Sequence, residues 1–150
     1  GAPTVGTNLS VDTGLRGDIT VRDGRVPRAP GEVAIDVTSA ENGNLPIGST
    51  VRILFQGTDE TFTVVGVVGF SDEDNLGGST TAFFDLPTAQ RLMGEKGLFD
   101  TIIVDADEGL AAEELATTVG ASLPGGFEAL TGDAVAEERA AELPPAEAVD

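Results

Sequence analysis

The chain has 150 residues, which is enough to bury the core of one domain without a stabilising metal or disulfide. It contains no cysteine and no histidine, which excludes disulfide bonds, thiolate nucleophiles, Ser-His-Asp triads and the usual zinc ligand sets. The 26 acidic and 8 basic residues give a net charge of −18, which repels nucleic acids and anionic lipid headgroups.

The N-terminal segment, residues 1–31, is poor in large apolar side chains, and we expect it to be loosely ordered. Within it only 18–22 alternates enough to be an edge strand. The pattern of 32–37 predicts a half-buried strand. Asp36 or Thr38 then caps a short helical turn that stops at a glycine.

The clearest hairpin of the chain joins a strand over 50–56 to a second strand over 61–70. The second strand carries apolar residues on both sides, which predicts a position in the interior of the sheet. Gly66 and Gly69 indicate a bulge or bend in it. Four of its side chains are expected to share one face: Phe62, Val64, Val68 and Phe70.

The remainder of the chain alternates between strand and helix patterns. A short strand over 80–84 precedes a helix that Asp85 caps and Gly94 ends. The later elements are a strand over 99–105, an amphipathic helix over 110–123, a strand over 127–130 and a last helix from Thr131 or Asp133 towards Leu143.

The core is expected to include Phe62, Val64, Val68, Ile53, Ile102 and Leu115. All seven phenylalanines lie in or beside expected strands, so core packing accounts for them. No segment approaches the roughly 18 apolar residues that a membrane-spanning helix needs.

Four stretches of the sequence carry a resemblance to a known family: VVGVVGF at 64–70, DNLGG at 74–78, TTAFFDLPTAQRLMG at 80–94 and GLFDTIIVDA at 97–106. Together they resemble the extracytoplasmic (periplasmic core) domain of MacB/FtsX-type ABC transporter permeases. The resemblance runs from about residue 24 to about residue 138 and is most specific over 62–105.

The order of the elements predicts an α+β fold, with a strand-rich lobe of about five to six strands and a smaller βαβα-like lobe. The expected organisation is a loosely ordered segment at 1–31, the strand-rich lobe at 32–98, the βαβα-like lobe at 99–143 and a disordered tail at 144–150. The resemblance implies that the second lobe is membrane-proximal and incomplete, with its other half before residue 1.

The resemblance implies a non-enzymatic domain on the extracytoplasmic side of the cell membrane, in a soluble piece of a larger membrane protein. Its implied partners are the transmembrane part of the same permease, an ABC ATPase subunit acting through the membrane domain, and an extracytoplasmic protein. Such a domain would couple cytoplasmic ATP hydrolysis to transport or to that partner. The alternative is a free-standing secreted binding or adhesion module.

The acidic loop at 72–78 has carboxylates at alternate positions and a glycine at the sixth, as a calcium loop does. However, Leu76 stands where an oxygen donor belongs, and Phe83 stands where a bidentate Glu would close the site. We therefore expect a solvated loop without metal, and a candidate interaction loop formed by Asp72, Asp74, Asn75, Leu76, Gly77 and Gly78.

Two patterns in the sequence are similar to those of catalytic sites. Asp105 ends an apolar strand as the Asp of a Walker B segment does, but the sequence has no phosphate-binding loop to pair with it. Paired carboxylates could serve glycoside hydrolysis, but without Trp or Tyr no stacking platform for a sugar is expected. These pairs are Asp59/Glu60, Glu113/Glu114 and Glu137/Glu138. No catalytic residue, cofactor or metal ligand is therefore expected.

The acidic residues concentrate towards the C-terminus: residues 105–150 contain twelve of them and a single basic residue, Arg139. This bias is interpreted as a contribution to solubility, with a docking face for a basic partner as the alternative.

Overall fold

A computed structural model describes residues 4–9, 19–55, 58–71, 73–74, 78–94 and 96–142. The chain divides into two compact units, Gly1–Ile103 and Val104–Asp150, called unit 1 and unit 2 below. No helix in the described part of the chain is both long enough and apolar enough to cross a membrane.

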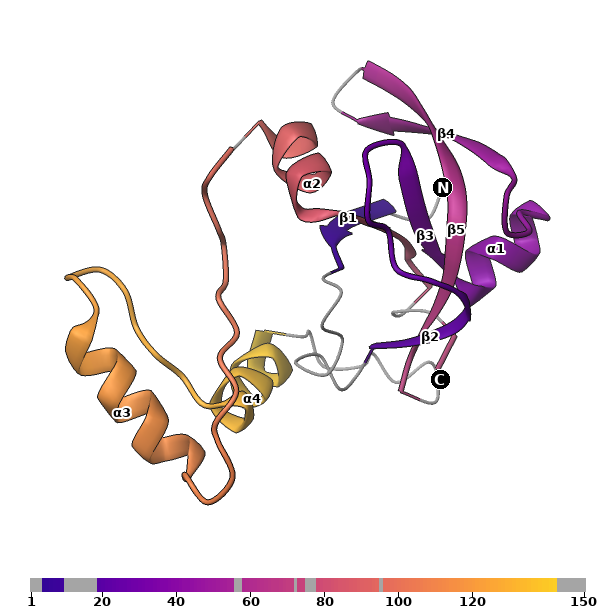
Figure 1. Ribbon diagram of the computed structural model, residues 1–150. Helices are drawn as coiled ribbons and strands as arrows, with labels where there is room; N and C mark the ends of the chain where they lie inside the picture. The colour runs from indigo at the N-terminus through magenta and orange to yellow at the C-terminus, as the bar shows by residue number, and fades with distance from the viewer. Residues whose placement is uncertain are drawn as a thin grey trace, which may run out of the picture. The chain divides into compact units, whose positions relative to one another are not determined.

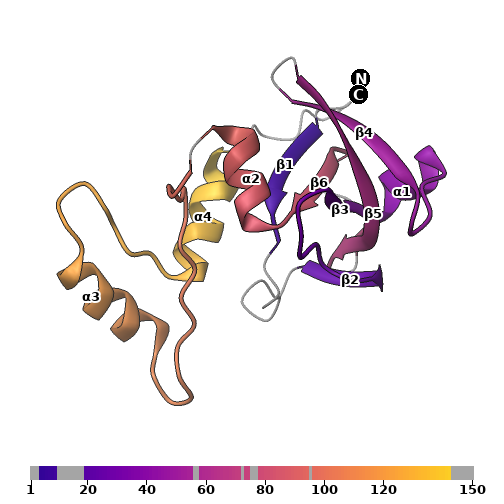
Figure 2. The same ribbon diagram turned by 45° about the horizontal axis from the view of Figure 1, so that its top comes forward.

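Unit 1 is built on a mixed sheet of six strands among its described residues (Figures 1 and 2). The strand order is β1-β6-β3-β5-β2, and β4 pairs with β5 outside this path. Two of the pairings, β1 with β6 and β3 with β5, are parallel. The strands are β1 (Thr4–Asn8), β2 (Ile19–Gly24), β3 (Glu32–Asp36), β4 (Thr50–Phe55), β5 (Thr58–Phe70) and β6 (Thr80–Phe84). The mixed sheet with its short helices confirms the α+β class.

The long strand β5 organises the sheet because it pairs with β2, β3 and β4. Its first part is antiparallel to β4, as the predicted hairpin requires, and its last part is antiparallel to β2. The register against β3 shifts where Val33 pairs with Val64 but Ala34 pairs with Gly66, so Val65 is the extra residue of a bulge. The bulge expected around Gly66 is therefore confirmed.

The bulge divides the apolar residues of β5 between the two faces of the sheet. Phe62 and Val64 belong to a buried cluster with Val33 and Ile35, whereas Val68 and Phe70 belong to a second cluster. The prediction that all four β5 side chains share one face is wrong, because one inserted residue reverses the alternation that follows it. The second cluster is completed by Leu9, Ile19, Val26, Ala34 and Phe83.

Two short helices contribute to the first cluster: α1 (Val37–Gly43) through Ala40 and α2 (Leu86–Met93) through Ala89. The Asp36 side chain caps α1 by accepting a hydrogen bond from Ser39 N at 2.8 Å, as one of the two sequence alternatives predicted. The second helix begins after Asp85, but the predicted side-chain cap is not formed, and the helix ends at Gly94, which takes the left-handed conformation. The predicted end of α1 at a glycine and the predicted limits of α2 are confirmed to within about two residues.

Two further features of unit 1 differ from the sequence expectations. The strand β1 was not predicted, because the sequence of Thr4–Asn8 has little apolar character and its parallel partner β6 lies far along the chain. The strand β3 is buried rather than half-buried, since β5 and β6 flank it on both edges and both faces are covered. Residues 10–18, between β1 and β2, lie outside the described residues.

Unit 2 contains the helices α3 (Ala112–Ser122) and α4 (Gly132–Glu142), drawn in orange and yellow in Figure 1. Both were predicted, and the hydroxyl of Thr131 caps α4 by accepting a hydrogen bond from Ala134 N at 3.2 Å. No residue of α3 is buried, so the prediction that Leu115 belongs to the core is wrong. The expected disordered tail at 144–150 lies outside the described residues.

The strands predicted at 99–105 and 127–130 are not formed. A strand needs a neighbouring backbone to complete its hydrogen bonds, and no described residue pairs with either segment. Their apolar side chains are exposed, with Ile102 at 75% and Phe127 at 71%. The prediction that Ile102 belongs to the core is therefore wrong, and so is core packing for Phe99 and Phe127.

Candidate functional site

The described residues contain no group of three or more Asp, Glu, His or Cys side chains that could hold a metal ion. The acidic pair at the start of β5 is engaged in ion pairs instead. Asp59 lies 3.3 Å from Arg52, and Glu60 forms two hydrogen bonds with Arg91, at 2.7 and 2.8 Å. The hydrogen bonds from Arg91 lower the pKa of Glu60 below its ordinary value. Neither carboxylate is arranged as a free acid or base.

The other acidic residues singled out in the sequence are exposed. Glu113 and Glu114 lie in the first turn of α3, where their charges suit the helix dipole. Glu137 and Glu138 are exposed on α4. Asp105 follows no strand, and its side chain accepts a hydrogen bond from the Ala106 amide at 3.0 Å. The likeness to a Walker B segment therefore has no structural counterpart.

The acidic loop is described only at Glu73, Asp74 and Gly78, since Asp72, Asn75, Leu76 and Gly77 lie outside the described residues. Its base is fixed at three points. Phe70 and Glu73 exchange two backbone hydrogen bonds, at 2.7 and 2.8 Å. The Arg22 guanidinium donates to the carbonyl of Ser71 at 2.6 Å, and the Thr38 amide donates to the carbonyl of Asp74 at 3.4 Å. The loop as an interaction site remains a prediction.

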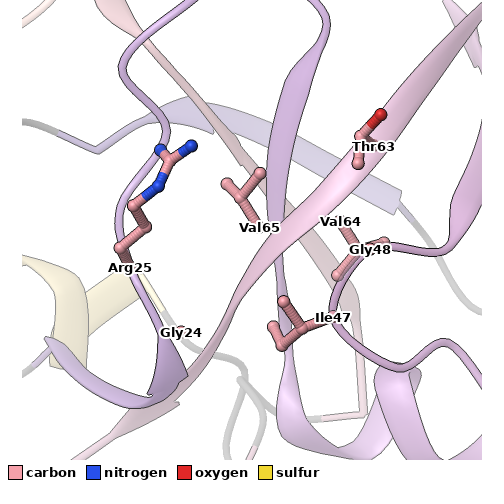
Figure 3. A pocket seen from close by; sticks show the side chains of 7 residues that line it. All are labelled: Gly24, Arg25, Ile47, Gly48, Thr63, Val64 and Val65. Carbon is pink, nitrogen blue, oxygen red and sulfur yellow. The ribbon is translucent and has the colours of Figure 1, made fainter.

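An open depression of about 390 Å³ lies along β5, where the pairing with β4 ends and the pairing with β2 begins. It is lined by Gly24, Arg25, Ile47, Gly48, Thr63, Val64 and Val65. In Figure 3, Arg25 lies on one side of β5, and Ile47 with Gly48 lies on the other. The depression is therefore mostly apolar, with one guanidinium at its margin.

The bulge in β5 creates this depression by directing two neighbouring carbonyls to two different partners. The carbonyl of Val64 accepts a hydrogen bond from Gly48 N at 2.7 Å, and that of Val65 accepts one from Arg25 N at 2.9 Å. Gly66 has to be a glycine because the carbonyl oxygen of Arg25 occupies the place of a Cβ atom.

The guanidinium of Arg25 is held by Glu32 through two hydrogen bonds, at 2.8 and 2.6 Å. The same carboxylate accepts a hydrogen bond from the Arg28 amide at 2.9 Å. These contacts, led by the one from Arg25, lower the pKa of Glu32 to about 2. Glu32 thus stabilises the turn between β2 and β3 and holds the Arg25 side chain beside the depression.

The depression could not be predicted from the sequence. Its residues come from three separate stretches, and the local signals are Gly24, which lines the depression, and Gly66, which follows its lining residues on β5. The segment between α2 and α3 also carries exposed apolar side chains, which are Leu98, Phe99, Ile102, Ile103, Val104 and Leu110.

The described part of the chain is thus a mixed-sheet domain in which the acidic pair at the start of β5 is engaged with arginines. The sequence profile of the MacB-like periplasmic core domain matches residues 4–122. The chain therefore belongs to this family and is an extracytoplasmic domain of an ABC transporter permease. Among curated proteins the sequence has no match. The match confirms the family and begins nearer the N-terminus than the resemblance did, consistent with the position of β1 in the sheet.

Proposed function

We propose that this domain couples ATP hydrolysis in the cytoplasm to transport or to a protein partner outside the membrane, without catalysing a reaction itself. The membership of the permease family carries this proposal. The transmembrane part of the permease and its ABC ATPase are the partners that such coupling requires.

Contacts between the elements of unit 1 support the proposal that it moves as a rigid body. The strand β5 joins three other strands, and Arg91 ties α2 to the start of β5 through its pair with Glu60. The Asp36 carboxylate also links β3 to β6 by accepting a hydrogen bond from Thr81 N at 2.7 Å. A body fixed at so many points transmits a displacement from one end to another instead of absorbing it.

The proposal that the domain is not an enzyme is supported by the engagement of its acidic pair on β5 with arginines. We expect purified protein to show no ATPase, protease or glycosidase turnover. Turnover that disappears in Asp59→Asn or Glu60→Gln would overturn this part of the proposal.

Lys96 offers a direct test of the coupling because it is the only lysine of the chain, and it is exposed after the end of α2. A lysine-specific protease applied from outside to the intact permease with its ATPase therefore cuts this domain at one site. We expect the cleavage rate at Lys96 to change when the ATPase is trapped with ATP. Lys96→Arg removes the site and provides the control. A rate that is identical in all nucleotide states would argue against coupling.

The family match argues against the alternative of a free-standing secreted binding module, which also predicts a different reading frame. Its reading frame would carry no membrane-spanning segments on either side of this domain, whereas the coupling proposal requires them. Sequencing the reading frame around this chain distinguishes the two.

A further inference from the structure

The sequence contains a single Asp-Gly pair, Asp23–Gly24, at the end of β2. Both residues are exposed. The amide of Gly24 donates a hydrogen bond to Oδ1 of Asp23 at 2.8 Å, so the side-chain carboxyl lies against the nitrogen of the next residue. Gly24 has a φ of 70°, a conformation that other residues rarely adopt.

We propose that Asp23 is a site of spontaneous isomerisation to isoaspartate in the folded protein. In the first step, the Gly24 nitrogen attacks Cγ of the protonated Asp23 carboxyl. A C–N bond forms, a carboxyl C–O bond breaks, and the hydroxyl leaves as water with the amide proton. The product is a five-membered succinimide. Water then adds to either carbonyl of the ring, which restores aspartate or yields isoaspartate, so the net reaction consumes no co-reactant.

The residue that follows Asp23 favours this position over the other aspartates of the described chain. A following glycine leaves its nitrogen unhindered, because no Cβ crowds the approach to the carboxyl carbon. Asp105 provides a comparison, since its carboxylate accepts an equivalent hydrogen bond from the next amide, at 3.0 Å, but that residue is Ala106. The chain therefore contains its own matched site with the same contact and a more hindered nitrogen.

Isomerisation at Asp23 would alter the margin of the depression on β5. Isoaspartate routes the backbone through the former side chain and adds one carbon between Asp23 and Gly24. Gly24 has no room for that displacement, because even a Cβ atom there would overlap the Val65 carbonyl oxygen. The adjacent hydrogen bond from Arg25 N to Val65 O, at 2.9 Å, is therefore the first expected to loosen.

The test is a peptide map of the native chain after prolonged incubation in heavy-oxygen water at neutral pH. We expect a mass-shifted isomer of the peptide that contains residue 23, with one heavy oxygen at that residue and the fragment ions of isoaspartate. The peptide that contains Asp105 should remain unchanged, and Asp23→Glu should abolish the isomer. In the separated isomerised fraction, the Arg25 amide should exchange its hydrogen faster.

A parallel incubation in urea shows whether the pair can react in the unfolded chain. If the unfolded chain forms isoaspartate at residue 23 while the native chain does not over the same period, the fold protects the site and the proposal is wrong. Equal isomer at Asp105 would also contradict it, because the glycine would then confer no advantage.

Discussion

Asp36 is a fully buried carboxylate that uses both of its oxygens as hydrogen-bond acceptors. One oxygen holds the Ser39 amide at the start of α1, and the other holds the Thr81 amide on β6. A single side chain therefore fixes the position of a helix and the pairing of two strands, and its loss would leave two backbone donors without partners.

Replacing this carboxylate tests how much it contributes to the free energy of unfolding. We expect Asp36→Ala to lower the free energy of unfolding by about 2–4 kcal/mol, from the lost cap and the unsatisfied amides. Urea unfolding followed by circular dichroism measures the change. Glu41→Ala, on an exposed position of α1, is the control and should shift stability by less than about 0.5 kcal/mol. Equal effects of the two variants would show that the Asp36 contacts are not stabilising.

Val64 is completely buried against the first apolar cluster, whereas Leu54 on the neighbouring strand is 70% exposed. We expect Val64→Asp to reduce stability by about 4 kcal/mol or more, because it buries a charge without a partner. Leu54→Asp makes the same chemical change in solvent and should be nearly neutral. A melting temperature of Val64→Asp close to that of Leu54→Asp would refute the placement of β5.

At the scale of elements, the turn between β2 and β3 depends on the pair formed by Arg25 and Glu32. The pKa of Glu32 is lowered to about 2 from an ordinary value of 4.5, chiefly by its hydrogen bonds with Arg25. A carboxylate whose pKa is lower in the native state stabilises the fold above its unfolded pKa. That stabilisation declines as the pH falls from about 4.5 towards about 2.

The pH dependence of stability gives a test of this pair. The difference in melting temperature between the natural chain and Glu32→Gln should be largest above pH 4.5 and should shrink as the pH approaches 2. Partial exposure of the pair to solvent limits its size. Glu41→Gln, which lies in solvent on α1, serves as the control. A difference that stays constant over this range would mean that Glu32 titrates normally.

Most elements could be predicted because their signals are local. The hairpin of β4 and β5, the cap at Asp36 and the helix between Asp85 and Gly94 all follow from neighbouring residues. The strand β1 could not be predicted because its pairing with β6 depends on residues far apart in sequence. The strands predicted at 99–105 and 127–130 are not formed, because an alternating apolar pattern gives a strand only where a neighbouring strand pairs with it.

The depression on β5 could not be predicted from the sequence for the same reason, since it depends on pairing between distant segments. The glycines of the strand predicted a bulge, but which residue would be inserted is decided by pairing with β3. Once Val65 is inserted, the carbonyls of β5 accept from two different segments, and the depression forms between them. No pattern along the chain brings these three segments together.

At the scale of the whole molecule, the two units differ in how much of their structure is buried. Unit 1 contains both apolar clusters, whereas α3 in unit 2 has no buried residue. Amide hydrogens of β3 and β5 should therefore exchange at least about ten times more slowly than those of α3, because they open only with the core. Hydrogen exchange followed by NMR measures this. Equally slow exchange in both units would contradict the account.

The proposed coupling requires that unit 1 moves as one body when the permease hydrolyses ATP. The absence of native cysteine allows spin labels to be placed by substitution, at the exposed positions Glu41 and Thr61 of unit 1 and at one position in the membrane part. Pulsed electron resonance on the intact permease with its ATPase then measures the distances in each nucleotide state. We expect the distance between Glu41→Cys and Thr61→Cys to stay constant, and the distance from either to the membrane part to change on ATP binding. Distances that are the same in every nucleotide state while ATP is hydrolysed would contradict the coupling role.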